Sequence, residues 1–263
     1  MMRSLWISKT GLDAQQTSLD TIANNLANVS TTAYKKVRPV FEDLMYQTMR
    51  APGLDDDSGQ VVGSGLQTGT GSRVASTQRI NSMGTLMQSQ NPLDLAINGN
   101  GYFVVETPSG TGYTRAGNFM RNNQGQITTP SGDLVLGTSG SPIVIPSTAT
   151  AISISTDGKV SYYNESATRP IAADQIAVAN FANSGGLLTS GGGVYRETVS
   201  SGSPQSGTAG SDGLGNITQY YTEQSNVNVA EELVGLIAAQ RAYEITTRGI
   251  SASDQMLQRL GQL

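Results

Sequence analysis

The amino-acid sequence predicts an α+β fold, with N- and C-terminal helices that pair as a coiled coil and a mainly antiparallel β domain between them. Three observations lead to this prediction. Apolar residues recur every seven positions near both ends, the middle of the chain alternates apolar and polar residues, and turn-forming residues interrupt that middle at short intervals. Because a seven-residue repeat keeps one apolar seam facing a partner helix, the two ends are expected to pair.

The first helix is expected from Ser4 to Val29, with the run 30–32 as its end. Its apolar stripe consists of Leu5, Leu12, Leu19, Ile22, Leu26 and Val29. Asn24, Asn25 and Asn28 are unusual there, because asparagine competes with the helical backbone for hydrogen bonds. They are consistent with capping of the helix end or with hydrogen bonds to a neighbouring subunit.

A second helix is expected from Tyr34 to Arg50, beginning near Pro39 and ending at residues 51–53. Its apolar residues recur at three- and four-residue spacings: Val37, Val40, Phe41, Leu44, Met45 and Met49. The glycine-rich stretch that follows, up to residue 72, is expected to form an extended connecting arm.

From Arg73 to about Tyr221 the apolar period becomes two, which predicts an antiparallel β domain. The expected strands are residues 73–80, 93–97, 102–106, 112–120, 126–128, 133–137, 141–146, 151–155, 159–163 and 175–181. The Gly/Ser-rich excursion near 183–215 is expected to be a long surface loop or partly disordered.

The last helix is expected to be capped by Ser225-Asn226 or by Asn228 and to run nearly to Leu263, with Glu231 and Glu232 in the first turn, where the helix dipole favours negative charge. Its apolar repeat consists of Val229, Leu236, Tyr243, Ile250 and Leu257. The chain is thus expected to comprise a terminal helical domain (1–33 and 225–263), a helix with a connecting arm (34–72) and a β-rich domain (73–224).

The composition argues against several classes of function. The 263 residues include no cysteine and no histidine, so disulfides, thiolate or imidazole metal sites, cysteine nucleophiles and histidine bases are excluded. The net charge of −4 and the lack of a long basic run argue against nucleic-acid binding. The N-terminus lacks the apolar core of a cleaved signal peptide, and no apolar run is long enough to predict a membrane-spanning helix.

No motif predicts catalysis or a cofactor. Gly99 and Gly101 lack the third glycine of a dinucleotide-binding turn. The run 55–59 has Leu66 where a calcium-binding loop needs its last glutamate. The adjacent acidic residues at 231–232 would point in different directions on a helix, so they do not predict a catalytic pair. Catalytic, metal and cofactor sites are therefore not expected.

Several segments resemble the flagellar rod and hook axial proteins. Residues 22–35, IANNLANVSTTAYK, resemble their N-terminal signature, and residues 225–257 resemble their C-terminal signature. Residues 96–105 and 113–119 resemble their shared strand-and-turn core. Position 33 is Ala where this family usually has Gly, which argues against a positive φ at that position.

Within the family, residues 41–53 and 63–71 and the overall length most closely resemble the members that build the distal rod. The resemblance implies a non-enzymatic subunit that self-assembles into a straight, rigid helical tube. Its terminal helices would line the tube, its β domain would face outward, and the tube would transmit motor torque across the periplasm to the hook. The implied localisation is the flagellar basal body, reached through the flagellar type III export apparatus without a cleaved signal peptide.

The resemblance also implies partners: further copies of the chain, the proximal-rod proteins, the hook protein and the surrounding P-ring and L-ring proteins, without nucleic acid and without direct membrane insertion. The expected assembly interface comprises Leu5, Leu12, Leu19, Ile22, Asn24, Asn25, Leu26, Asn28, Val29, Val229, Leu233, Leu236, Gln240, Arg241, Tyr243, Ile250 and Leu257. The candidate rod-stiffening segment comprises Phe41, Leu44, Tyr46, Met49, Leu54, Val61 and Leu66.

Two alternatives to a distal-rod subunit stay open at this point. One is a flexible hook-type axial subunit. The other is a secreted β-rich adhesin with helical oligomerisation ends, which would explain the terminal repeats and the β region but not the family motifs. An enzyme bound to the cell wall is a more remote third possibility.

Overall fold

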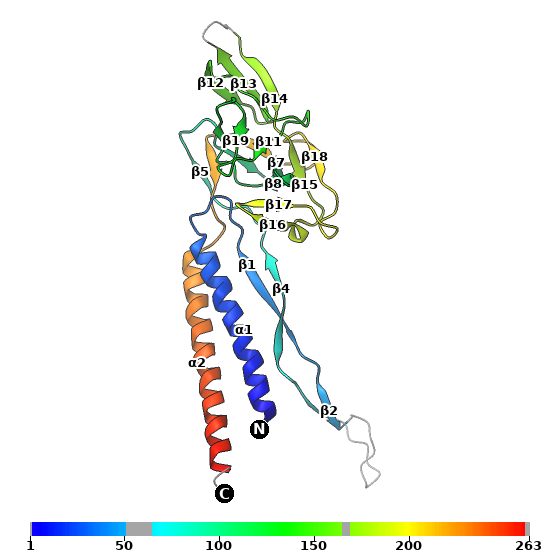
Figure 1. The fold of residues 1–263 in the computed structure, drawn as a ribbon, viewed down its shortest axis with the longest axis vertical. Helices are drawn as coiled ribbons and strands as arrows, with labels where there is room; N and C mark the ends of the chain where they lie inside the picture. Colours follow the sequence, from blue (N-terminus) through cyan, green and yellow to red (C-terminus); the bar gives the residue numbers. More distant parts are fainter. Residues whose placement is uncertain (1, 51–64, 165–168, 261–263) are drawn as a thin grey trace. The chain divides into compact units, whose positions relative to one another are not determined.

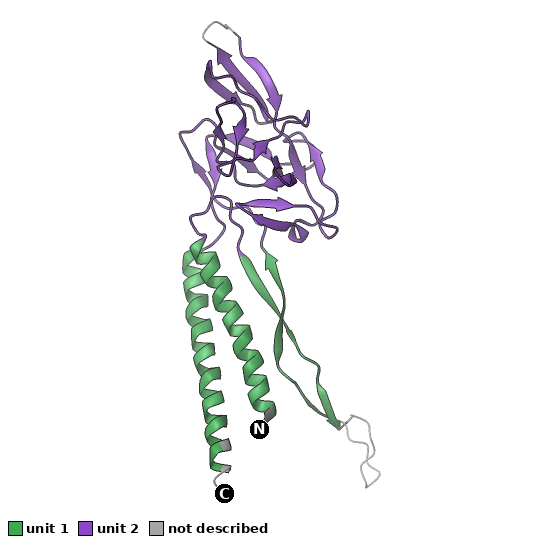
Figure 2. Cartoon of the chain, in the orientation of Figure 1, with its two compact units in different colours: residues 1–27, 37–79, 228–263 green, residues 28–36, 80–227 purple. Residues whose placement is uncertain are grey.

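The computed structural model describes residues 2–50, 65–164 and 169–260. A long helix lies near each end of the chain and strands lie between them (Figure 1), as the sequence predicts. The chain divides into two compact units (Figure 2). Unit 1 comprises Met1–Ala27, Val37–Arg79 and Asn228–Leu263, and unit 2 comprises Asn28–Lys36 and Ile80–Val227.

The two helices of unit 1, α1 (Met2–Ala27) and α2 (Val229–Leu260), lie side by side (Figure 1). Asn25 Nδ2 donates a 3.1 Å hydrogen bond to Glu232 Oε2. Gly235 approaches Ile22, and Gly11 approaches Thr246. Since the position on α2 rises as the position on α1 falls, these contacts define an antiparallel helix pair.

The predicted second helix is wrong, because residues 37–50 form a β ribbon in unit 1. Strand β1 (Val37–Asp43) pairs antiparallel with β4 (Ser72–Arg79), and β2 (Gln47–Arg50) pairs with β3 (Leu66–Thr68). β-Branched Val37 and Val40 favour strands over helices. Pro39 is tolerated because each strand of a two-stranded ribbon has an unpaired edge.

The ribbon packs closely against α1. Strand β4 begins beside Gly71, whose φ of 120° suits glycine, and a Cβ placed there would lie 2.1 Å from Thr10 Oγ1 on α1. The Gly71 carbonyl accepts a 2.9 Å hydrogen bond from the Leu44 amide. A side chain at position 71 would therefore separate the ribbon from the helix.

Unit 2 is a β domain, as predicted. Its elements are β5 (Leu86–Gln88), β6 (Leu95–Asn98), β7 (Tyr102–Thr107), β8 (Gly110–Thr114), β9 (Met120–Arg121), β10 (Ile127–Thr128), β11 (Leu134–Val135), β12 (Ala149–Ile154), β13 (Lys159–Asn164), β14 (Ile171–Gln175), β15 (Val178–Asn180), the 3₁₀ turn η1 (Ser184–Gly186), β16 (Leu188–Gly191), β17 (Val194–Arg196), β18 (Gln205–Gly207), β19 (Asn216–Gln219) and β20 (Tyr221–Glu223). Every strand pairing among these described elements is antiparallel.

Strand β7 organises the largest sheet of unit 2, which has nine strands within the described residues. It pairs with β8 along one edge and shares the other edge between β15 and β11. Both faces of β7 are buried: Phe103 and Val105 enter one apolar cluster, while Tyr102 and Val104 enter another. Alternation of the side chains explains why the continuous apolar run 102–105 is a strand.

The Gly/Ser-rich excursion forms regular structure. Residues 183–215 contain η1, β16, β17 and β18, and β16 and β17 pair into the nine-stranded sheet. Ser201 is 1% exposed and donates from Oγ to the Thr198 carbonyl at 2.9 Å. Side-chain hydrogen bonds of this kind let small polar residues hold a compact turn in place of apolar contacts.

Candidate functional site

A buried cluster of three charged side chains lies in unit 2. Lys35 Nζ contacts Glu223 Oε1 at 2.5 Å, and Arg115 Nε contacts Glu223 Oε2 at 2.7 Å. Each of the three residues is at most 6% exposed. Two cations and one carboxylate leave an excess positive charge away from water, which is costly unless the remaining donors are satisfied.

Backbone carbonyls satisfy those donors. Arg115 donates from its Nη atoms to the carbonyls of Ile97, Gly99 and Gly101 at 2.9, 2.5 and 2.5 Å. Lys35 Nζ also donates to the Ser82 carbonyl at 2.8 Å. The arginine thereby fixes the turn between β6 and β7, where Gly99 and Gly101 have φ values of 119° and 134°.

The environment shifts the pKa of both Lys35 and Glu223. Burial alone would raise the pKa of Glu223, but the positive charges of Arg115 and Lys35 together hold it below its ordinary value. Burial lowers the pKa of Lys35, since the attraction of Glu223 only partly offsets the loss of hydration. Glu223 is therefore ionised at neutral pH.

The cluster joins three separate stretches of unit 2. The Ala33 amide donates to the Glu223 carbonyl at 2.8 Å, and the Gly84 amide donates to Glu223 Oε1 at 2.9 Å. The Lys36 amide donates to Asn226 Oδ1 at 2.7 Å, and Asn226 Nδ2 donates to the Ile80 carbonyl at 2.8 Å. Segments 33–36, 80–84 and 223–226 are thus held at one point.

Sequence reasoning did not identify this cluster as a site. Lys35 ends the N-terminal motif, Arg115 lies in the motif 113–119, and Glu223 lies two residues before the C-terminal motif. The signal was that the charged residues of an otherwise charge-poor chain stand in or beside the recognised motifs. Because the partners are far apart in sequence, spacing alone does not pair them.

The expectation about Ala33 is wrong. Ala33 has a φ of 56°, in the left-handed region that L-residues disfavour, and is 4% exposed. Its hydrogen bond to the Glu223 carbonyl shows that tertiary contacts hold the strained conformation.

On α1, the predicted leucine stripe and the contact with α2 lie on different faces. Each residue advances about 100° around a helix, so the stripe formed by Leu5, Leu12, Leu19 and Leu26 is centred about 90° from the line through Gly11 and Ile22. The four leucines are half-buried. The residue that faces the ribbon, Thr10, lies about 90° from that line in the other direction.

On α2, the predicted repeat is only partly covered within the chain. Leu236 and Ile250 are half-buried, and Ala239, which is not part of the repeat, is 6% exposed. Val229, Leu233 and Tyr243 are 41%, 44% and 36% exposed, and Gln240 and Arg241 are exposed. Leu257 lies on α2.

The asparagine cluster serves different parts of the chain. Asn25 is 1% exposed, and its amide donates to the Val37 carbonyl at 2.8 Å as well as to Glu232, so it joins α1, β1 and α2 within one chain. Asn28 Oδ1 accepts a 3.1 Å hydrogen bond from Thr31 Oγ1 in the turn that follows α1. Asn24 is exposed on α1, and Val29 is half-buried in unit 2.

The candidate stiffening residues lie along the ribbon. Phe41, Tyr46, Met49 and Leu66 are 43%, 55%, 64% and 57% exposed, and Leu44 is half-buried between β1 and β2. Leu54 and Val61 lie outside the described residues. The ribbon therefore presents an exposed apolar surface in place of the predicted amphipathic helix.

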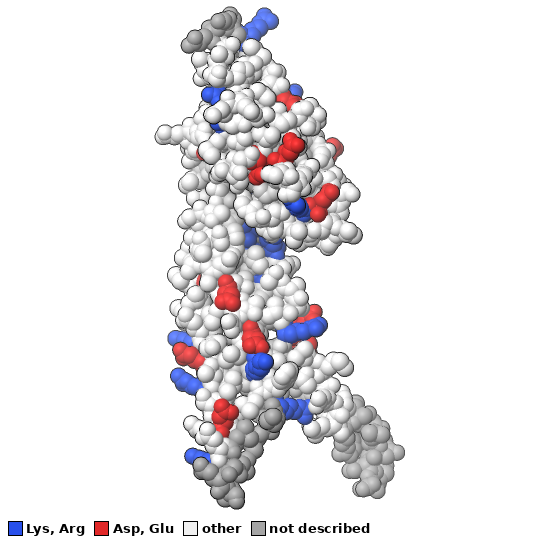
Figure 3. Space-filling model, in the orientation of Figure 1, with Lys and Arg blue, Asp and Glu red and all other residues white. Residues whose placement is uncertain are grey.

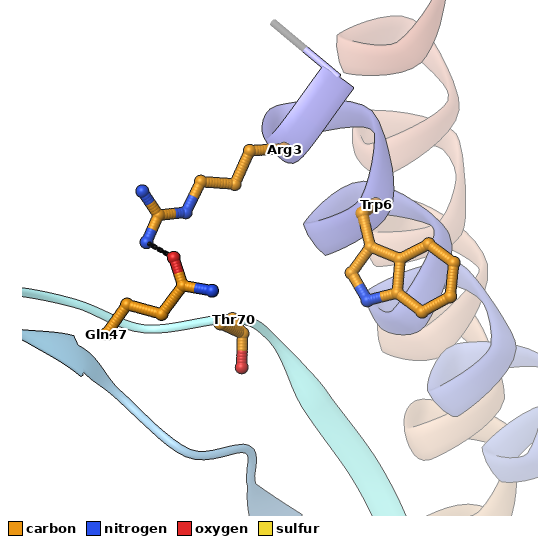
Figure 4. A pocket seen from close by; sticks show the side chains of 4 residues that line it. All are labelled: Arg3, Trp6, Gln47 and Thr70. Atoms are coloured by element: carbon orange, nitrogen blue, oxygen red, sulfur yellow. Dashed lines mark hydrogen bonds between the residues drawn. The ribbon is translucent and has the colours of Figure 1, made fainter.

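A cavity of about 440 Å³ lies between α1 and the ribbon in unit 1, lined by Arg3, Trp6, Gln47 and Thr70 (Figure 4). Arg3 Nη2 donates to Gln47 Oε1 at 2.5 Å, which links the first turn of α1 to β2. Trp6 is 57% exposed, and Lys9 Nζ lies 5.5 Å from its ring centroid. These four described lining residues do not form a catalytic constellation.

Surface charges are sparse and mixed on the face drawn in Figure 3. Among the described residues, no group of three or more acidic side chains is placed to bind a metal ion. Neither described helix has an apolar stretch long enough to span a bilayer. Exposed apolar side chains lie along α2 and the ribbon, and the half-buried leucine stripe lies along α1. Such surfaces suit contacts between proteins.

Three family models match the chain in sequence order. They describe the flagella basal body rod protein (residues 6–35), the flagellar hook protein FlgE/F/G D1 domain (96–162) and the flagellar basal body rod FlgEFG protein C-terminal region (218–263). All three describe structural components of the bacterial flagellum.

Similar proteins extend the match over the whole chain. The flagellar basal-body rod protein FlgG of Buchnera aphidicola (Acyrthosiphon pisum) is 50% identical over 100% of both chains. FlgG of Caulobacter vibrioides is 44% identical and FlgG of Bacillus subtilis 39% identical, each over 100% of this chain and 99% of the relative. The chain belongs to the family of flagellar basal-body rod proteins, which are structural rather than enzymatic.

Proposed function

We propose that this chain is a structural subunit of the flagellar distal rod, which self-assembles into a straight, rigid helical tube and transmits motor torque across the periplasm to the hook. The observation that carries the proposal is full-length identity of up to 50% to rod proteins named FlgG. The half-buried leucine stripe of α1 and the exposed apolar residues of α2 supply the chemistry for self-assembly.

In this proposal, residues 1–33 and 225–263 form a coiled coil that lines the tube, residues 34–72 form a connecting arm, and residues 73–224 face outward. The half-buried leucines of α1 and the exposed Val229, Leu233 and Tyr243 of α2 support a role between subunits. Each such side chain stabilises the polymer by roughly 1.5–3 kcal/mol when fully buried, opposed by the cost of ordering. Heterologous contacts that do not close into a ring produce a tube.

The proposed partners are further copies of the chain, the proximal-rod proteins, the hook protein and the P-ring and L-ring proteins around the rod. The chain would reach the basal body through the flagellar type III export apparatus, without a cleaved signal peptide. The family matches to rod and hook components support this location.

Electron microscopy of the purified polymer tests the main proposal. A straight tube is expected, because a drive shaft must keep its axis under torque. A curved tube would favour the flexible hook-type subunit instead, and the absence of any tube under polymerising conditions would favour the adhesin alternative.

The ribbon is the proposed stiffening element. Its exposed residues Phe41, Tyr46, Met49 and Leu66 can contact a neighbouring subunit while β1 and β4 stay anchored to α1. Deletion of residues 46–63 is expected to yield curved or fragile polymers, measured as a shorter persistence length in micrographs. An unchanged straight rod would refute the bracing role.

A further inference from the structure

Helix α2 also carries an exposed stripe of residues that do not belong to its seven-residue repeat. Its members follow one another at spacings of four, three and four residues: Val234, Ala238, Arg241, Ile245, Gly249, Ala252 and Met256. We call this set the outer stripe. Val234, Ile245 and Met256 are 69%, 69% and 55% exposed, and a Cβ added to Gly249 would have no neighbour within 4 Å.

The outer stripe alternates large and small side chains, as helix-packing surfaces do. Three large apolar side chains stand eleven residues apart, and Ala238, Gly249 and Ala252 leave low points between them. An eleven-residue repeat corresponds to about 3.67 residues per turn, so the stripe runs nearly along the axis of α2. Arg241 fits such a surface because its aliphatic stem can lie along a partner while its guanidinium reaches water.

We propose that the outer stripe receives the leucine stripe of α1 (Leu5, Leu12, Leu19 and Leu26) from the next copy of the chain. The inference rests on the proposed self-assembly and specifies the contact that propagates it. The two stripes match in length, since 21 and 22 residue steps at about 1.5 Å each span roughly 32 and 33 Å. One offers four leucines about 10.5 Å apart along the helix axis. The other offers low points between its large side chains.

The rotation of the two stripes also fits a repeating contact. The leucine stripe lies about 90° from the α2-facing line of α1, and the outer stripe lies about 90° from the α1-facing line of α2. When each helix is viewed from its own N-terminus, the two stripes are rotated in opposite senses from the line that faces the other helix. Because the helices are antiparallel, the two rotations have the same sense when both helices are viewed from one end. Each helix can therefore contact one partner in its own chain and another in a neighbouring chain.

A zigzag row of alternating α1 and α2 helices results from repeating this contact. The leucine stripe of one copy meets the outer stripe of the next at every step. Because these are two different surfaces, the contact is heterologous and can continue beyond a dimer. The ribbon does not cover the leucine stripe, because Thr10 and Gly71 meet on the side of α1 opposite the leucines. The alternative is that the outer stripe stays uncovered in the polymer.

Cysteine cross-linking tests the contact directly, since the chain contains no cysteine of its own. Two double variants, Leu12→Cys/Ile245→Cys and Leu19→Cys/Ile245→Cys, are polymerised, oxidised and run on denaturing gels without reductant. At least one is expected to give a ladder of covalent multimers. The control is Asp13→Cys/Ile245→Cys, because Asp13 is exposed on α1 about 100° from Leu12.

No ladder from either leucine variant, or an equal ladder from the Asp13 control, would overturn the proposed docking. The polymers used in this experiment must first form, as judged by sedimentation. Failure of the unsubstituted chain to polymerise would count against self-assembly itself, so the two failures are distinguishable.

Lysine substitutions provide an independent test. Ile245→Lys and Met256→Lys place a charge in the outer stripe, and each is expected to raise the critical concentration for polymerisation about tenfold or more. Gln255→Lys adds the same charge at an exposed position beside the stripe and should leave the critical concentration within about twofold of the unsubstituted chain. Equal effects of Met256→Lys and Gln255→Lys would contradict the proposal.

Discussion

At the scale of single residues, Ala33 stores conformational strain beside the buried cluster of Lys35, Arg115 and Glu223 in unit 2. Its positive φ of 56° is maintained although a methyl group disfavours it. The hydrogen bond from its amide to the Glu223 carbonyl ties this strain to the charged cluster. A substitution that removes this strain would therefore measure how much one backbone conformation costs in free energy of unfolding.

Ala33→Gly is expected to raise the free energy of unfolding by roughly 1 kcal/mol, because glycine adopts this conformation without a Cβ clash. Urea denaturation measures the change. Ala96→Gly is the control, since Ala96 is a buried position on β6 of unit 2 where glycine should lower stability by about 1 kcal/mol. A loss of stability in Ala33→Gly would show that the buried methyl outweighs the strain.

Glu223 makes unit 2 sensitive to acid. Its folded-state pKa lies below its ordinary value of 4.5, so its contribution to stability is present above pH 4.5 and is lost as the pH falls through the folded-state pKa. Glu223→Gln leaves two buried cations without a carboxylate and should cost roughly 3–5 kcal/mol at pH 7. Denaturation at several pH values should show a weaker acid dependence in the variant. An identical dependence would assign the acid sensitivity to other groups.

At the scale of secondary structure, the β ribbon shows where sequence patterns mislead. The spacings of Val40, Leu44 and Met45 fit a helix, yet the pairing of β1 with β4 determines the structure. The paired residues lie between 29 positions (Asp43 and Ser72) and 42 positions (Val37 and Arg79) apart, beyond the reach of a local pattern. The terminal helices and most strands of unit 2 were predictable, because their periodicity is long or their turns are well marked.

The site was less predictable than the fold. The leucine stripe of α1 stood out because its residues repeat every seven positions, whereas the outer stripe of α2 repeats every eleven and includes small residues. The cluster of Lys35, Arg115 and Glu223 depends on contacts between distant segments, which no spacing rule specifies.

Gly71 is expected to control how the ribbon is held against α1. Gly71→Ala places a methyl against Thr10 and imposes an unfavourable positive φ, so it should destabilise unit 1 by roughly 1–3 kcal/mol. Hydrogen exchange should then show faster opening of β1 and β4.

Gly110→Ala separates the two causes. Gly110 has a similar φ of 113°, but a Cβ there would meet nothing within 4 Å. Gly110→Ala should therefore lower stability through the unfavourable φ alone, without pushing a strand away from a helix. Equal losses in both variants would mean that the contact with Thr10 is accommodated.

At the scale of the whole molecule, the two units differ in how much they bury. Unit 2 contains both apolar core clusters, including the fully buried Phe103 and Val105, whereas unit 1 buries only a few small or polar side chains among its described residues, such as Ala14 and Ala239. Stability should therefore be uneven along the chain.

Hydrogen exchange of the dilute monomer is expected to show weak protection in α1 and α2 and strong protection in β7 and β8. Polymerisation should protect the helices, because their exposed stripes become buried. Circular dichroism before and after assembly would follow the same ordering. Full protection of both helices in the monomer would contradict this expectation.

The ion pair between Lys35 and Glu223 also sets a condition on the timing of folding. These two residues are 188 positions apart. Their ion pair is therefore among the later contacts that a chain synthesised from its N-terminus can make. Until residue 223 has emerged, Lys35 has no carboxylate to bind and Arg115 has no full set of acceptors. Unit 2 therefore cannot complete its fold until nearly all of its residues are present, however early its first strands pair.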